Sequence, residues 1–168
     1  MKKTTCLAAY GVLAALALVL GYLETLVPVF FAVPGMKLGL TNLVVLVALY
    51  RMDARAAVTV NVVRIALNAM LFGTAVSLWY ALAGGLLSGA VMIALKRTGR
   101  FQPLTVSVAG GVAHNAGQIA VAMLVMQTAA VAWYLLALWA SGIAAGAVIG
   151  LLGSRLIERL PRTEGSMA

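Results

Sequence analysis

Apolar residues fall into six runs along the chain, each separated from the next by a short polar or basic stretch. The runs cover residues 5–22, 38–50, 55–72, 75–95, 106–126 and 130–152. A helix needs about 20 apolar residues to cross the hydrocarbon core of a bilayer. The second run is short and follows an apolar loop at 28–37. The pattern predicts an all-α membrane protein. We expect a six-transmembrane-helix bundle that forms one domain over 1–160, with a disordered tail at 161–168.

The composition agrees with a membrane protein. Of the 168 residues, 64% are hydrophobic and 10% are charged, and the mean hydropathy is +1.06. A soluble domain is about one quarter charged, so this chain lacks the polar side chains to cover a soluble surface. The net charge of +8 could indicate a nucleic-acid partner. The basic residues lie at the ends of the apolar runs, however, so we expect a lipid bilayer and no nucleic acid.

The positions of the basic residues predict the topology. Ten of the twelve precede the first run, follow the sixth, or lie in the loops after the second and fourth. These ten are Lys2, Lys3, Arg51, Arg55, Lys96, Arg97, Arg100, Arg155, Arg159 and Arg162. Basic loops stay in the cytoplasm, so both termini are expected there. A signal peptide ending at Ala15-Leu16-Ala17 is the less favoured alternative, because the apolar run continues past that site.

Arg64 lies in the middle of the third run, between Asn61 and Asn68. Spacings of three and four residues place all three side chains on one face of a helix. An ionised side chain at membrane depth costs about 2.5 kcal/mol or more and usually marks a functional site. We therefore expect this face to line a ligand site.

Other polar residues can join Arg64. On the fifth run, Gly111 shares one helix face with three polar residues. Three more polar residues lie at or just before the start of the second run, and Glu24 follows the first run. With this topology the sets can converge on a cavity open to the outside, and the excess of cationic groups favours a carboxylate or phosphate ligand. The alternative is a structural network in which Arg64 pairs with Glu24 and the amides bond to backbone carbonyls. The predicted ligand-binding residues are Glu24, Lys37, Asn42, Asn61, Arg64, Asn68, His114, Asn115 and Gln118, with Thr41 beside them.

The sequence lacks the residues of several reaction types. Its acidic residues are Glu24, Asp53, Glu158 and Glu164, with no paired-aspartate motif to hold magnesium on a diphosphate. It has no GxxxxGK[ST] phosphate loop. A single histidine and the single cysteine, Cys6, favour neither a metal site nor a disulfide. We expect no metal, no cofactor and no catalytic residues, which leaves a facilitator or a binding subunit.

Small residues recur at four-residue spacing on three runs. Such stripes let helix backbones approach closely in lipid. They can serve packing inside the bundle or docking against another membrane protein. The candidate partner-docking residues are Gly11, Ala15, Gly85, Gly89, Gly142, Gly146 and Gly150.

Four motifs together resemble a known family. These are Pro34-Gly35-Met36-Lys37-Leu38-Gly39-Leu40-Thr41-Asn42, Arg64 with Leu71-Phe72-Gly73, Gly84-Gly85-Leu86-Leu87-Ser88, and His114-Asn115-Ala116-Gly117-Gln118. They look like a bacterial membrane family labelled heptaprenyl diphosphate synthase component I, or Gx transporter. The resemblance runs from about residue 24 to residue 150. Thr41 departs from the alanine expected at its position.

That family is similar to the substrate-binding S components of energy-coupling factor (ECF) transporters. The resemblance implies a six-helix subunit in the bacterial cell membrane that captures a small, vitamin-like, anionic molecule from outside. A transmembrane coupling protein and two ABC-type ATPase subunits would drive uptake. The synthase label instead implies an accessory membrane subunit of isoprenoid or quinone biosynthesis, and a facilitator that acts alone is a third alternative. Flavins, isoprenoid precursors and quinone precursors all stay open as ligands.

Overall fold

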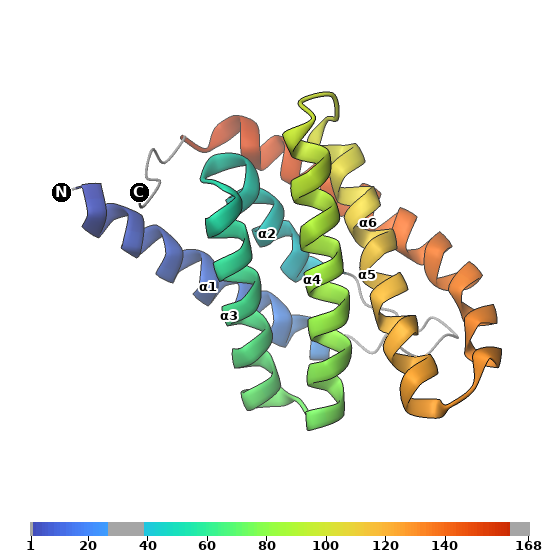
Figure 1. Cartoon of the computed structure of the whole chain (residues 1–168). Helices are drawn as coiled ribbons and strands as arrows, with labels where there is room; N and C mark the ends of the chain where they lie inside the picture. The colour runs from blue at the N-terminus through green and yellow to red at the C-terminus, as the bar shows by residue number, and fades with distance from the viewer. Residues whose placement is uncertain (1, 27–38, 162–168) are drawn as a thin grey trace.

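The computed structural model describes residues 2–26 and 39–161, and within these ranges the chain is helical with no strand. Figure 1 shows the helices in chain order. They are α1 (Lys2–Leu26), α2 (Leu40–Arg51), α3 (Ala54–Phe72), α4 (Ala75–Arg97), α5 (Pro103–Met126), the 3-10 helix η1 (Ala129–Trp133) and α6 (Tyr134–Arg159). The predicted loop at 28–37 and all but the first residue of the predicted tail at 161–168 lie outside the described residues.

Local sequence signals set the helix boundaries. Asp53 Oδ1 accepts a hydrogen bond from Ala56 N at 2.6 Å and so caps α3. Thr74 and Ser77 form a reciprocal capping box at the start of α4. Pro103 begins α5, where its missing N–H costs nothing.

The predicted all-α membrane bundle is confirmed, and the second helix is the one that differs from the rest. Five helices in the described ranges are long and apolar enough to cross a membrane. The helix α2 has 12 residues and is therefore about 18 Å long, against about 30 Å of hydrocarbon core. Since α2 ends at the basic loop, its first turn lies within the depth of the bilayer.

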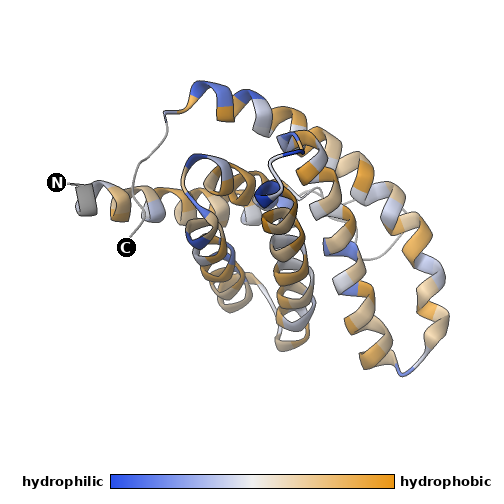
Figure 2. Ribbon diagram, turned by 45° about the horizontal axis from the view of Figure 1, so that its top comes forward, coloured by the Kyte–Doolittle hydropathy of each residue, from blue (hydrophilic) through white to orange (hydrophobic). Residues whose placement is uncertain are grey.

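The short helix α2 is also the most buried element. Residues 44–49 are all buried, whereas lipid-facing residues on the long helices are exposed. The helices α1, α3 and α6 pack around α2, and the most extensive contacts elsewhere join α4 to α5 and α5 to α6. In Figure 2 hydrophobic residues dominate the long helices, with few hydrophilic positions inside them. The core of the bundle therefore sits around α2.

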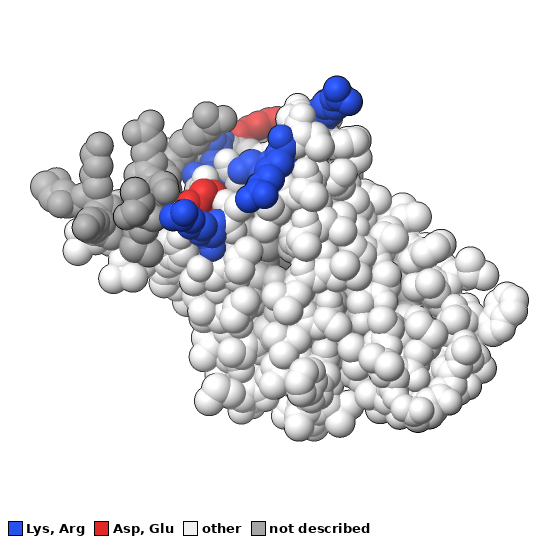
Figure 3. All heavy atoms as spheres, in the orientation of Figure 1, with Lys and Arg blue, Asp and Glu red and all other residues white. Residues whose placement is uncertain are grey.

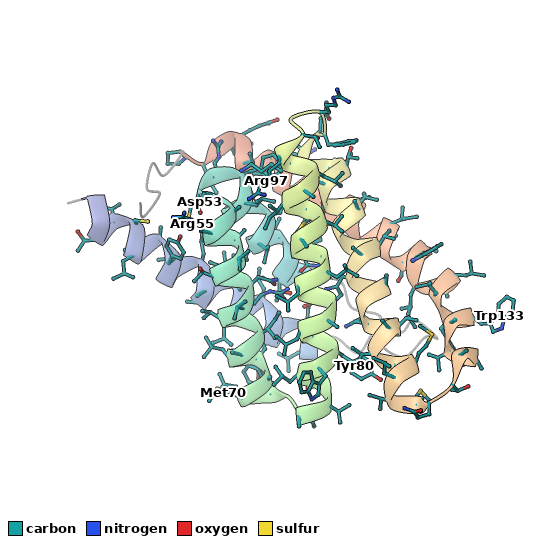
Figure 4. All side chains as sticks on the ribbon, in the orientation of Figure 1. Asp53, Arg55, Met70, Tyr80, Arg97 and Trp133 are labelled. Carbon is teal, nitrogen blue, oxygen red and sulfur yellow. The ribbon has the colours of Figure 1, made fainter. Side chains whose placement is uncertain are left out.

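The charged residues agree with the predicted topology. The α2–α3 and α4–α5 turns lie at the same end of the bundle in Figure 1, and Figure 3 shows lysine and arginine gathered at that end. At the opposite end lie exposed aromatic residues such as Trp133, which is labelled in Figure 4 opposite Arg97. Basic loops on one side and aromatic residues near the membrane interfaces are both typical of membrane proteins.

Most of the small-residue stripes pack inside the bundle. A Cβ atom built at Gly146 would lie 2.7 Å from Val108 Cα, and one built at Gly150 would lie 2.8 Å from Leu104 Cα. Gly142, Gly85 and Gly89 are likewise buried against α5 or α3. These five candidate docking residues therefore face neighbouring helices of the bundle. Gly11 and Ala15 are the two that are exposed, and a Cβ at Gly11 would meet nothing within 4 Å.

Candidate functional site

Arg64 is buried near the middle of α3, with 6% of its surface exposed. Its Nη1 donates to Thr41 Oγ1, and its Nη2 donates to Asn42 Oδ1 at 3.0 Å. Both acceptors belong to the first turn of α2. Its Nε donates to Asn61 Oδ1 at 2.9 Å, one turn earlier on α3. The guanidinium thus joins two helices, and all of these acceptors are neutral oxygens.

Asn61 connects this arginine to a third helix. Its Nδ2 donates to the carbonyl oxygen of Gly85 on α4 at 2.9 Å. Gly85 allows the approach, because a Cβ there would lie 2.5 Å from Ile65 Cδ1. The polar face predicted on the third run therefore points into the bundle between α2 and α4.

Glu24 of α1 also contacts the first turn of α2, through a backbone N–H group. Its Oε1 accepts a hydrogen bond from the backbone N–H of Leu40 at 2.9 Å. The residue before, Gly39, occupies the N-cap position with φ of 74° and offers no side chain to accept that bond. Glu24 therefore caps α2 from the C-terminal end of α1, while its charge also attracts Arg64. The alternative in which Glu24 directly pairs with Arg64 is replaced by two contacts on one helical turn.

Asn68 lies one turn beyond Arg64 on α3 and packs against α1. A Cβ at Gly21 would lie 2.6 Å from Asn68 Nδ2, so glycine leaves the space that this amide fills. Asn68 Oδ1 is buried and has no hydrogen-bond partner among the described residues. The asparagine extends the polar face of α3 toward the C-terminal end of that helix.

The polar face of α5 divides between two neighbours. Asn115 Nδ2 donates to Leu138 O and lies 3.4 Å from Ser141 Oγ, so it bonds α5 to α6. His114 and Gln118 pack on Gly84 of α4, where a Cβ would lie 3.0 Å from His114 Cε1. Because α4 lies between α3 and α5, these side chains do not bond to Arg64.

The structure therefore brings together part of the predicted set. Glu24, Thr41, Asn42, Asn61 and Arg64 form one connected group around the start of α2, which we call the α2 cluster. Asn68 lies beyond it on the same helix, and the α5 residues lie across α4. Lys37 lies outside the described residues.

Three residues near these groups were not among the predicted ligand-binding residues. Gly21 makes room for Asn68, and Gly84 makes room for His114. Ser88 on α4 is 1% exposed, and its Oγ has no hydrogen-bond partner among the described residues. Gly84 belongs to a quoted motif, but only a contact across helices distinguishes Gly21 from the other glycines of the chain.

One small cavity lies beside the α2 cluster. It lies between α2, α3 and α4, has a volume of about 10 Å³ and is lined by Val45, Asn61 and Met92 among others. That volume holds about one water molecule. Within the described residues no three of His, Cys, Asp and Glu lie close enough to hold a metal ion. The side chains of this cluster offer hydrogen bonds and charge.

Comparison with known proteins gives one match. The family model described as heptaprenyl diphosphate synthase component I matches residues 13–156. No curated protein and no solved structure matches. The matched range includes the whole α2 cluster.

Proposed function

The chain belongs to the heptaprenyl diphosphate synthase component I family, and from this premise we propose that it is a non-catalytic membrane subunit that binds a small anionic molecule. The observation that carries the proposal is the buried Arg64, whose hydrogen bonds to the described residues all end on neutral oxygens. A buried charge without full compensation is costly in a bilayer, and an anionic ligand supplies that compensation.

The acidic residues support a binding role rather than prenyl-chain elongation. Asp53 caps α3 at the basic end, and Glu158 is exposed near the end of α6. Glu24 is the one described carboxylate at the α2 cluster. A diphosphate substrate held through Mg²⁺ needs carboxylates grouped around the ion, and these three are dispersed.

We propose substrate capture for uptake as the specific role, similar to that of an S component. The α2 cluster lies at the start of α2 and beside the C-terminal end of α1, and by the topology expected from the basic residues this end of the bundle would face the outside of the cell. The sequence has no phosphate loop, and energy would come from partners: a transmembrane coupling protein and two ABC-type ATPase subunits. The ligand would be a small, vitamin-like anion.

The family description favours a second candidate. An accessory membrane subunit of isoprenoid or quinone biosynthesis would bind a prenyl diphosphate and work beside a soluble prenyltransferase. A prenyl diphosphate is also anionic, and its apolar chain suits a site within the bilayer. Both candidates use Arg64 in the same way and differ in their protein partners.

One purification separates the candidates. The tagged chain is extracted from its native membrane in mild detergent, and co-purifying chains and small molecules are identified by mass spectrometry. ATPase subunits together with a bound anion support uptake, whereas a prenyltransferase and a prenyl diphosphate support the second role. If no partner chain co-purifies and liposomes that hold this chain alone carry substrate flux, both candidate functions are contradicted. The chain is then a stand-alone facilitator.

The matched variant is Arg64→Ala. It should lose the bound anion and keep the same co-purifying chains, because Arg64 is buried away from the surface of the bundle. A variant that retains the anion at the wild-type level shows that the arginine is structural.

A further inference from the structure

Two opposite charges reach the first turn of α2 from different helices. Glu24 of α1 accepts the N–H of Leu40, and Arg64 of α3 donates to the side chains of the next two residues, Thr41 and Asn42. The carboxylate and the guanidinium thus flank three consecutive residues. Their attraction adds to the hydrogen bonds that hold this turn.

This turn has two independent reasons to attract an anion. The first N–H groups of a helix carry the positive end of its dipole, and at the start of α2 the N–H of Leu40 is bonded to Glu24 and that of Asn42 to Gly39 O. Gly39 gives them no side-chain acceptor. Beside them lies a guanidinium that is 6% exposed. A guanidinium has five N–H donors, and three are used in bonds to the described residues.

We propose that Glu24 fills an anion position between the start of α2 and Arg64, and that a carboxylate or phosphate group of the ligand competes with Glu24 for it. This inference rests on the proposed function, since it places the charged end of the ligand. The ligand would take the Leu40 N–H from Glu24 and would also bind guanidinium N–H groups of Arg64 other than the three already bonded to described residues. Glu24 can leave because it lies two residues from the end of α1. The Arg64 contacts to neutral oxygens stay in place during the exchange.

The test is rescue of Glu24→Ala by a small anion. The purified variant in neutral detergent micelles is heated with sodium formate or with sodium chloride at equal ionic strength. Formate supplies the missing carboxylate, so the melting temperature should rise by about 2–4 °C or more over chloride. The double variant Glu24→Ala with Arg64→Ala should lose this difference, because one of the two donors is gone.

The matched control is Asp53→Ala, since Asp53 also caps a helix with a carboxylate, through Ala56 N, but lies at the basic end of the bundle. Equal formate responses of the two variants, or no response of Glu24→Ala, overturn the proposal. If Glu24→Ala does not fold, Glu24→Gln replaces it, since a neutral amide can cap α2 but carries no charge to attract Arg64. Formate should then displace the amide and stabilise Glu24→Gln more than the wild type, and an equal effect on the two proteins overturns the proposal.

Two further arms separate the sources of the anion. Inorganic phosphate should act like formate, since both are soluble and small. Phosphatidylglycerol added to the micelles should give no larger effect than phosphatidylcholine, and stabilisation by the anionic lipid alone contradicts a site for a soluble ligand. Failure of this rescue leaves the partner identification above unaffected, so the two proposals fail separately.

Discussion

Asn61 holds Arg64 in place from one helical turn away and fixes the orientation of its own amide at the same time. Its Oδ1 accepts from Arg64 Nε at 2.9 Å, and its Nδ2 donates to Gly85 O at 2.9 Å. A carboxylate at this position can do the first and not the second. The amide is therefore the group that positions the guanidinium without neutralising it.

We predict that Asn61→Asp abolishes anion binding in a folded protein. The new carboxylate pairs with Arg64 and neutralises the charge that, on the proposed function, attracts the ligand. The amount of bound small molecule per purified chain should fall at least tenfold in mass spectrometry. The loss of the bond to Gly85 O should also cost about 1–3 kcal/mol of stability.

The same substitution at Asn115 is the control. Asn115 Nδ2 donates to Leu138 O on α6, so Asn115→Asp also loses a buried donor but leaves Arg64 unchanged. Its melting temperature should fall while the bound molecule is retained. Equal retention of the molecule in both variants would show that neutralising Arg64 has no effect.

Gly21 and Asn68 should behave as a coupled pair. A Cβ at Gly21 would lie 2.6–2.9 Å from atoms of the Asn68 side chain. Gly21→Ala should therefore destabilise the bundle by about 1–3 kcal/mol, the usual cost of overpacking. In Asn68→Ala the space is free, so adding Gly21→Ala should cost much less. Thermal unfolding of the four proteins of this double-mutant cycle measures the coupling.

Gly11 on the same helix provides the reference. A Cβ there meets nothing within 4 Å, and alanine is the better helix former. Gly11→Ala should therefore be neutral or slightly stabilising. Additive effects of Gly21→Ala and Asn68→Ala would contradict the contact between them.

The periodic features of the fold could be predicted from the sequence. Long apolar runs and basic loops identified the all-α membrane bundle, since both follow from the thickness and charge preference of a bilayer. The ends of the helices were less accurate. The predicted fourth run stops at 95 and the sixth at 152, whereas α4 continues to Arg97 and α6 to Arg159. Lysine and arginine form helix well and are favourable near a C-terminus, so basic residues extend these helices beyond the apolar runs.

The candidate site could be predicted only in part. The spacing of Asn61 and Arg64 was enough to place them on one face, because helical period decides it. Which helix packs against that face depends on tertiary packing, so the pattern of residues along one helix cannot predict it. His114 and Asn115 share a face by period, yet one packs on Gly84 and the other bonds to α6. The partner of each polar side chain is a tertiary property.

Lys96 should stabilise the C-terminal end of α2. Its Nζ donates to Leu49 O and lies 5.3 Å from the centre of the Tyr50 ring. A cation near the last carbonyl groups of a helix interacts favourably with the helix dipole, and the Tyr50 ring adds a cation–π contact. Lys96→Gln should therefore lower the free energy of unfolding by about 1 kcal/mol. Chemical denaturation in micelles gives the value.

The neighbouring Arg97 is the control, because it is exposed on the same last turn of α4. Arg97→Gln removes the same charge and should change stability by less than about 0.5 kcal/mol. Equal losses for the two variants would assign the effect to net charge rather than to the end of α2.

The final prediction concerns the contact between α5 and α6. Gly146 lies against the backbone of α5, where a Cβ would be 2.7 Å from Val108 Cα and 3.0 Å from Ser107 O. Backbone cannot move aside as a flexible side chain can, so Gly146→Leu must separate the two helices. Close approach of backbones is what stabilises helix pairs in lipid, so the melting temperature should fall strongly.

The amount of bound ligand should distinguish this loss of helix packing from damage to the α2 cluster. Gly146 lies on α6, and Arg64 bonds only to α2 and α3 among the described residues. At a temperature where Gly146→Leu is still folded, it should retain the bound small molecule at the wild-type level. Gly11→Leu, on an open face of α1, should change neither quantity unless a partner chain is present. Loss of the small molecule from folded Gly146→Leu would show that the site extends across α5 to α6, and that the α2 cluster alone is too small a description of it.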